Sequence, residues 1–467
     1  GALNSDQVAA LTTAQVGTLD TAQVQAITTA AVAAMTNAQV GAMSTTQVAA
    51  LTTGQMAALT AAEVKALSTS QVQALGTAQI NALSNANVAA LTTTQVASLT
   101  AGQVTGLSTA AAASLVTAQV QALSSTQVQA ISTANVAAMS STQLSALTTG
   151  QVSALTTAQV VALETADVAA LSTAQVAALT TDQVKVLESA DVVAMSTGQV
   201  AALSTAQVQA LTDGNVTALS TSQVQAMSTA QVNALSTAQV VAMTTSQVAS
   251  LTAAQVKGMS TDQVKALENA DVQVLNATQI KALTTAQVQA LETTDVAGLN
   301  TTQLAALTAD QVSALTTAQV VSLTTTEVSN LSYDQVKALT TTQLQAVETA
   351  DVAVLNSDQV SSLSATQVQA FTTAQVEKLS TGVIAGLSNT QVGALSTDQV
   401  AALTTGQVKS LTAGEVTALS SDQVAVLTNA QLGALSTGQI QALEVGDVAA
   451  MSTTQVNALS TTQVNAL

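Results

Sequence analysis

Large apolar residues return at every eighth position of the chain, from Leu3 to Leu467, without one inserted or deleted residue. A second apolar series, mostly Val, follows five residues behind the first and runs from Val8 to Val464. A fixed short period is typical of repeat architectures, whose units bury their apolar faces only against neighbouring units. We therefore predict one continuous octapeptide-repeat solenoid over residues 1–467.

Each octad carries the signals that start a helix. In the octad that begins at Ser204, the hydroxyl of Ser204 and the side chain of Gln207 have the spacing of a capping box. Leu203 and Val208 have the spacing of the hydrophobic staple that fixes how the chain enters a helix. Of 58 cap positions, 50 hold Ser, Thr, Asn or Asp, so the octad predicts a new helix every eight residues.

One unbroken helix does not explain the spacing. Eight residues at about 100° each turn roughly 800°, so equivalent residues drift by about 80° per repeat and form no stripe. A β-solenoid is the alternative, because Val and Thr favour strands. Strict alternation would place the Val and Leu series on opposite faces unless a turn intervened, and the chain has no Pro and only 20 Gly to make such turns.

The predicted fold is therefore all-α, a solenoid of capped helices of about seven residues with one linking residue between them. Such a short link favours an open bend, and three bends close a triangular turn, so we expect about three octads per turn. Leu, Val and the Ala before each Leu, such as Ala10, Ala50 and Ala210, are expected to line the interior. The chain opens and closes in mid-repeat, so we expect a segment of a longer array or ends that meet other subunits.

Six octads exchange the usual cap for Glu, and the same six exchange the Gln for Asp. The pairs are Glu164 with Asp167, Glu188 with Asp191, Glu268 with Asp271, Glu292 with Asp295, Glu348 with Asp351, and Glu444 with Asp447. Two carboxylates three residues apart repel unless they are screened, protonated or bridged, and Ca²⁺ accepts such oxygen ligands. The other interpretation is that Asp favours the positive end of the helix while Glu points into water. The pairs are the candidate metal residues, and Ca²⁺ is the only ion they suggest.

Composition excludes several functional classes. The chain has no Cys and no His, so disulfides, thiolate or imidazole metal sites and Ser–His or Cys–His catalysis are absent. We predict no enzymatic activity and no organic cofactor. The 26 acidic residues against 8 Lys disfavour nucleic acid as a partner, and no apolar run approaches the roughly 18 residues of a membrane span. Glycosylation is a further possibility, since Asn215, Asn276, Asn300 and Asn330 each begin an Asn-x-Ser/Thr sequon.

The unit Leu-Thr-x-x-Gln-Val-x-Ala-Leu resembles octad stretches of very large bacterial surface and secreted fibrous proteins, along the whole chain. The resemblance implies an extracellular or cell-surface structural protein: a rod, stalk or filament, adhesive or self-assembling end to end or side by side. The alternative is a binding module whose rows of Ser and Thr recognise ice, mineral or glycan.

Overall fold

The computed structural model describes residues 3–467, and these contain 58 short α-helices and no strand. Helices begin every eight residues, from α1 at Ser5 to α58 at Thr461. Four residues form α4, α44, α48, α55 and α58; five form α1, α2, α10, α12, α13, α14, α18, α20, α22, α23, α30, α33, α34, α37, α40, α45, α46, α49, α52 and α53; six form each of the others. The all-α prediction is confirmed, and the β-solenoid is excluded for the described residues.

Helix α51 (Thr405–Ser410) shows how each octad starts and stops. Its cap, Thr404, has an extended backbone at φ −70° and ψ 158°, and its Oγ1 accepts from the backbone N–H of Gln407. At the other end Leu411 is again extended, at φ −57° and ψ 139°, while its N–H donates to the carbonyl of Val408 at 3.2 Å. Both the Leu and the cap that follows it thus leave the helical conformation. The helices are consequently four to six residues long, shorter than the predicted seven.

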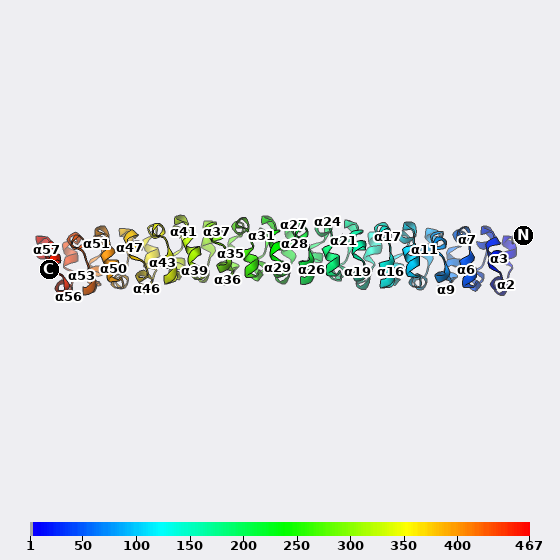
Figure 1. Ribbon diagram of the computed structural model, residues 1–467, viewed down its shortest axis with the longest axis horizontal. Helices are drawn as coiled ribbons and strands as arrows, with labels where there is room; N and C mark the ends of the chain where they lie inside the picture. Colours follow the sequence, from blue (N-terminus) through cyan, green and yellow to red (C-terminus); the bar gives the residue numbers. More distant parts are fainter. Residues whose placement is uncertain (1–2) are drawn as a thin grey trace. The chain divides into compact units, whose positions relative to one another are not determined.

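The chain forms two compact units, unit 1 over Gly1–Leu235 and unit 2 over Ser236–Leu467. Within each unit every helix packs on the helix three octads away, as α21 (Thr165–Ala170) does on α24 (Ser189–Ala194) and α39 (Ala309–Ala314) on α42 (Tyr333–Ala338). Figure 1 shows the short helices of each unit following one another in a regular row. The prediction of three octads per turn is confirmed, and the octad register passes from unit 1 to unit 2 in the sequence without a break.

The Val and Leu series form the interior of each unit, as predicted: Val408 is 1% exposed and Leu411 5%. Burying one such side chain contributes about 1.5–3 kcal/mol. Helices of this length are unstable alone in water, so stacking in successive turns is what makes them fold. The Gln of the capping box is also buried, and the sequence pattern had not placed it inside.

The Ala before Leu is not in the interior: Ala50 and Ala210 are half-buried and Ala10 is exposed, so the predicted place of this residue is wrong. Glycines in this slot reveal what it packs against. A Cβ built on Gly106 would overlap Cγ2 of Thr77, the first residue of α10 (Thr77–Asn81), 29 residues earlier. The slot therefore lies against the start of a helix in the preceding turn, at the edge of the core, and most octads fill it with Ala, Ser or Gly.

Candidate functional site

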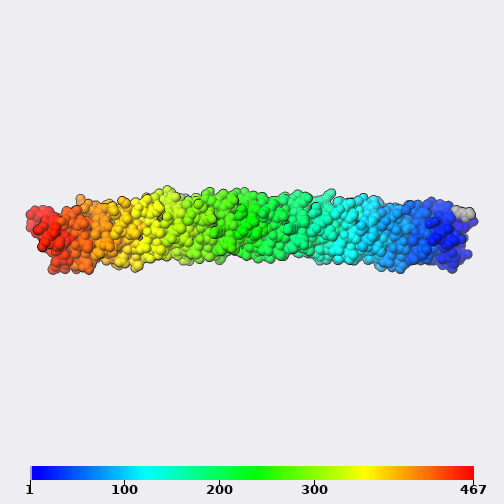
Figure 2. Space-filling view, viewed as in Figure 1, coloured from blue at the N-terminus to red at the C-terminus, as the bar shows by residue number. Residues whose placement is uncertain are grey.

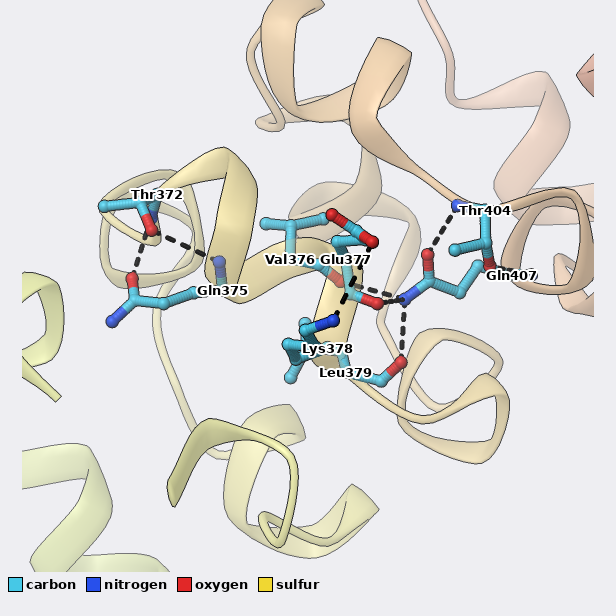
Figure 3. Close-up of polar contacts among 8 residues, drawn as sticks. All are labelled: Thr372, Gln375, Val376, Glu377, Lys378, Leu379, Thr404 and Gln407. Carbon is cyan, nitrogen blue, oxygen red and sulfur yellow. Dashed lines mark hydrogen bonds and ion pairs between the residues drawn. The ribbon is translucent and has the colours of Figure 1, made fainter. Parts of the chain in front are cut away.

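The buried Gln is the most elaborate polar centre of the octad. At Gln407 the side-chain Oε1 accepts the backbone N–H of Thr404 at 2.7 Å, and the backbone N–H of Gln407 donates to Oγ1 of Thr404 at 3.2 Å. This is the reciprocal capping box that the sequence predicts, and Figure 3 shows the first of these bonds. It satisfies two of the N–H groups that the start of a helix leaves without partners.

The amide nitrogen of the same side chain contacts the preceding turn. Nε2 of Gln407 donates to the carbonyls of Val376 at 2.8 Å and Leu379 at 2.7 Å, at the carboxyl end of α47 (Thr373–Lys378) (Figure 3). These carbonyls belong to the end of a helix, where the regular i+4 donors are missing. The Val376 carbonyl also accepts the backbone N–H of Leu379 at 3.2 Å. We call the Gln, its cap and the two carbonyls a glutamine corner. One side chain thus caps the start of its own helix and the end of an earlier one.

The glutamine corner recurs along both units. In unit 1 the bond to the carbonyl 28 residues earlier runs from Gln39, which reaches Leu11, to Gln231, which reaches Leu203. In unit 2 it runs from Gln279, which reaches Leu251, to Gln463, which reaches Leu435. Sequence reasoning identified the capping box and missed this second bond. The signal was available: a capping box takes Glu as readily as Gln, yet this chain uses Gln in most octads and Glu in only three, and the Gln amide can also donate.

The acidic pairs divide into one exposed and one buried carboxylate. In all six the Glu is exposed and the Asp is buried, as with Glu164 and the 4%-exposed Asp167. Asp167 Oδ2 accepts the backbone N–H of Glu164 at 2.9 Å, and five of the pairs make this bond; Glu348 and Asp351 are the exception. None of the six Glu side chains caps its helix. The pair therefore keeps half of the capping box.

Burial changes the acidity of several of these Asp side chains. The pKa values of Asp191, Asp271, Asp295 and Asp351 are all raised above the ordinary value, chiefly because burial disfavours the charged form. The negative charge of the neighbouring Glu raises each pKa further. The hydrogen bond from the Glu188 backbone to Asp191 acts in the opposite direction.

The calcium hypothesis stays a prediction. Each pair presents a single exposed carboxylate, and no three Asp or Glu side chains of the described residues are grouped so that they could hold a metal ion together. The preceding turn contributes a hydroxyl to some pairs: Ser141 donates to Asp167 at 2.7 Å, and Ser421 donates to Asp447 at 2.9 Å. These bonds engage the buried carboxylates within the protein.

The four sequons have different environments. Asn215 occupies the Gln position of its octad, is 1% exposed, and donates from Nδ2 to the Leu187 carbonyl at 3.1 Å. A sugar on that nitrogen would break the contact, so Asn215 does not suit glycosylation of the folded chain. Asn276, Asn300 and Asn330 are exposed.

The face of each unit that Figure 2 shows has no deep cleft. One open hollow in unit 2 is lined in part by Lys257, Lys281 and Asp310, all of them exposed. Among residues 3–467 no helix has the length and apolar character needed to cross a membrane. The polar chemistry of the described residues is therefore concentrated in the corners between turns.

The sequence pattern of the ALTTAQ repeat matches most of the chain, at residues 16–53, 52–85, 128–157, 160–190, 184–221, 216–253, 241–269, 264–296, 288–325, 344–381, 377–405, 400–437 and 440–467. The chain belongs to the ALTTAQ repeat family. The six letters of that name occur here at residues 154–159. They comprise the linking Leu155, the cap Thr156 and the corner Gln159 of one octad, and each matched range spans several octads. No curated protein matches the chain.

Proposed function

We propose that this ALTTAQ repeat chain is a non-enzymatic structural protein: a segment of an extracellular or cell-surface rod, stalk or filament. The residues of each octad are largely used for stacking, with Val and Leu in the interior and Gln between turns. Its resemblance to octad stretches of bacterial fibrous proteins supports the same role. In this proposal the chain's partner is a further copy of itself, end to end or side by side.

The glutamine corner is the observation that carries the proposal. Each corner joins an octad to the preceding turn through the same bonds, so an added octad finds the contacts that its predecessor found. Repeat stability is then close to a sum of intrinsic terms and nearest-neighbour terms, with no limit on length. A protein whose task is to span a distance needs this property.

Electron microscopy of chains with different octad numbers tests the proposal. We expect extended particles whose length grows in proportion to the number of octads, and sedimentation velocity should show association as concentration rises. Particles whose length does not follow the octad number would overturn the structural role. Extended particles that stay monomeric at every concentration would favour a stalk over a filament.

A binding surface is the second candidate, because Thr residues at the first helical position are exposed, as Thr405 is. The cap hydroxyl beside it, on Thr404, already accepts a hydrogen bond from its own helix. Only one of the two hydroxyls is thus fully available to ice, mineral or glycan. Thermal hysteresis at low protein concentration would support ice binding, whereas fibres without thermal hysteresis would support the filament.

A further inference from the structure

Three corners hold Glu in place of Gln: Glu63, Glu327 and Glu415. All three side chains are buried, with exposures of 1%, 6% and 2%. In each, Oε2 accepts the backbone N–H of the cap residue at 2.6 Å, as Oε1 of Gln does elsewhere. The second carboxyl oxygen, Oε1, therefore takes the place of the Gln amide nitrogen.

With Glu at this position, a carboxylate oxygen faces backbone carbonyl oxygens, and all of these atoms are hydrogen-bond acceptors. The register of the neighbouring corners places Oε1 of Glu63 at the carbonyls of Val32 and Met35, since Gln55 reaches Val24 and Ile27. Among the described residues, Oε1 of Glu63 is the one buried side-chain nitrogen or oxygen without a hydrogen-bond partner. An ionised carboxylate only accepts hydrogen bonds, whereas a protonated carboxyl can donate one. A proton on Oε1 would restore the missing donor.

No opposite charge stabilises an ionised Glu63. The helices packed against its own helix α8 (Ala61–Ala66) are α5 (Asn37–Ala42) and α11 (Asn85–Ala90), and neither contains a charged residue. The helix whose end Glu63 faces, α4 (Thr29–Val32), has none either. The nearest cation in sequence, Lys65, is exposed on α8.

Glu415, on α52 (Ala413–Thr417), has equally neutral surroundings. Its packing partners α49 (Asn389–Gly393) and α55 (Thr437–Ile440) carry no charged side chain, and neither does α48 (Thr381–Ile384), whose end it faces. Burial raises the pKa of Glu415 above its ordinary value, against the opposing effect of its hydrogen bonds with Thr412.

Glu327 differs, because its negative charge acts on Asp351 in a helix packed against its own and raises the pKa of that Asp. The Glu327 corner therefore has a second buried acid close to it. Glu63 and Glu415 are the two corners in which a single carboxyl group acts alone.

We propose that Glu63 and Glu415 keep a proton in the folded chain at a pH where exposed glutamates are ionised, and donate it from Oε1 to the facing carbonyls. For Glu63 these belong to Val32 and Met35, and for Glu415 the register gives Ile384 and Leu387. The two corners are then proton-dependent latches in an array in which most corners hold Gln, whose amide does not titrate. Loss of the proton removes the donor and leaves a buried charge against two carbonyl oxygens.

Infrared spectroscopy near pH 6 tests where the proton is, because an exposed glutamate with a pKa of about 4.3 is ionised there. The variant is E63Q/E415Q, which restores the residue found in most corners and should fold. The matched control is E377Q, since Glu377 is 53% exposed beside Lys378. We expect the wild-type minus E63Q/E415Q difference spectrum to contain the carbonyl stretch of a protonated carboxylic acid, and the difference with E377Q to contain only carboxylate bands. Carboxylate bands alone in both differences would overturn the proposal.

Hydrogen exchange tests the latch itself. If local opening of a helix releases one proton, the equilibrium constant for opening rises about tenfold for each unit of increase in pH. At pH values above the pKa of an exposed glutamate and below the pH at which the folded corners lose their proton, we expect the amide protection factors of α8 and α52 to fall by about that factor per unit in wild type and in E377Q. They should stay constant in E63Q/E415Q. Equal pH dependence in all three proteins would show that the two corners do not open with loss of a proton.

Discussion

At the scale of the residue, one glutamine carries out three tasks. Gln407 accepts from its cap, donates its backbone N–H to the same cap, and donates its amide to the preceding turn. Asn has the donor but is shorter: Asn87 reaches the Leu59 carbonyl at 2.6 Å and makes no capping box. Glu and Asp lack the amide donor. The choice of Gln is therefore a consequence of both length and chemistry.

Replacing Gln407 with Ala should destabilise the flanking octads by about 2–4 kcal/mol, because it removes several hydrogen bonds and takes the side-chain donor away from the Leu379 carbonyl. Hydrogen exchange of α47 and α51 measures this effect. The matched control is Q345A, since Gln345 is an exposed side chain on another helix. Equal protection in Q407A and Q345A would contradict a stabilising role for the corner.

The acidic octads should respond to pH in a definite direction. Burial raises the pKa of Asp271, so the folded chain holds this proton more tightly than the unfolded chain. Its contribution to stability is present below the ordinary value of 3.8 and is lost as pH rises through the raised folded pKa. We expect E268S/D271Q, which restores the common octad, to stabilise the chain more at pH 7 than at pH 4 in urea unfolding. A gain that is equal at both values would contradict this assignment.

The same variant separates calcium from the second interpretation of the acidic pairs. If the pairs bind Ca²⁺, adding the ion should raise the melting temperature of wild type more than that of E268S/D271Q. Equal shifts in the two proteins would rule out a contribution from the Glu268 and Asp271 pair.

At the scale of the element, each helix is too short to be stable and is completed by its neighbours. The cap and the Gln satisfy its amino end, and a Gln from the following turn satisfies its carboxyl end. Successive turns also approach closely at the slot before each Leu, which most octads fill with Ala, Ser or Gly. Packing between helices therefore favours small residues in that slot.

The G106A variant tests the close approach at this one position, because the new Cβ would overlap Cγ2 of Thr77. We expect a loss of about 1–3 kcal/mol, measured by hydrogen exchange of α10 and α13 (Ala101–Thr105). Adding T77S, which removes that methyl group, should recover most of the loss. The control is G150A, where a Cβ meets no atom within 4 Å and should stabilise its helix by about 0.5–1 kcal/mol. Similar effects of G106A and G150A would contradict the packing argument.

At the scale of the whole molecule, the octad is the unit in which the chain tolerates change. Every contact between turns follows the octad register, from the Val and Leu series to the corners. An insertion or deletion of eight residues keeps this register, and a change of four residues destroys it. The sequence, which keeps the register over its whole length, is consistent with that constraint.

Deleting residues 300–307, one octad of unit 2, should leave the helical circular dichroism per residue unchanged. Deleting residues 300–303 joins Leu299 directly to Leu304 and removes both a cap and a corner. We expect local unfolding there, detected as lost amide protection in the flanking octads. Equal protection in the two deletion variants would show that the octad is not the structural unit.

The sequence by itself determined the helices and their boundaries to within a few residues, because caps, staples and apolar spacing are local signals that repeat in strict register. It also gave the number of octads per turn, since a link this short permits only an open bend. Helix length was overestimated by one to three residues, because the extended conformation of the linking Leu depends on packing in the next turn.

Only the tertiary structure decided where the polar groups of the octad go. The Gln amide bonds a carbonyl 28 residues earlier, and no local rule specifies a partner at that distance. The tertiary structure also buried Asp167 and left Glu164 exposed, and it placed Ala210 at the edge of the core. The physical reason is the same in each case: local chemistry specifies how a helix starts, whereas stacking of successive turns specifies which atoms lose contact with water.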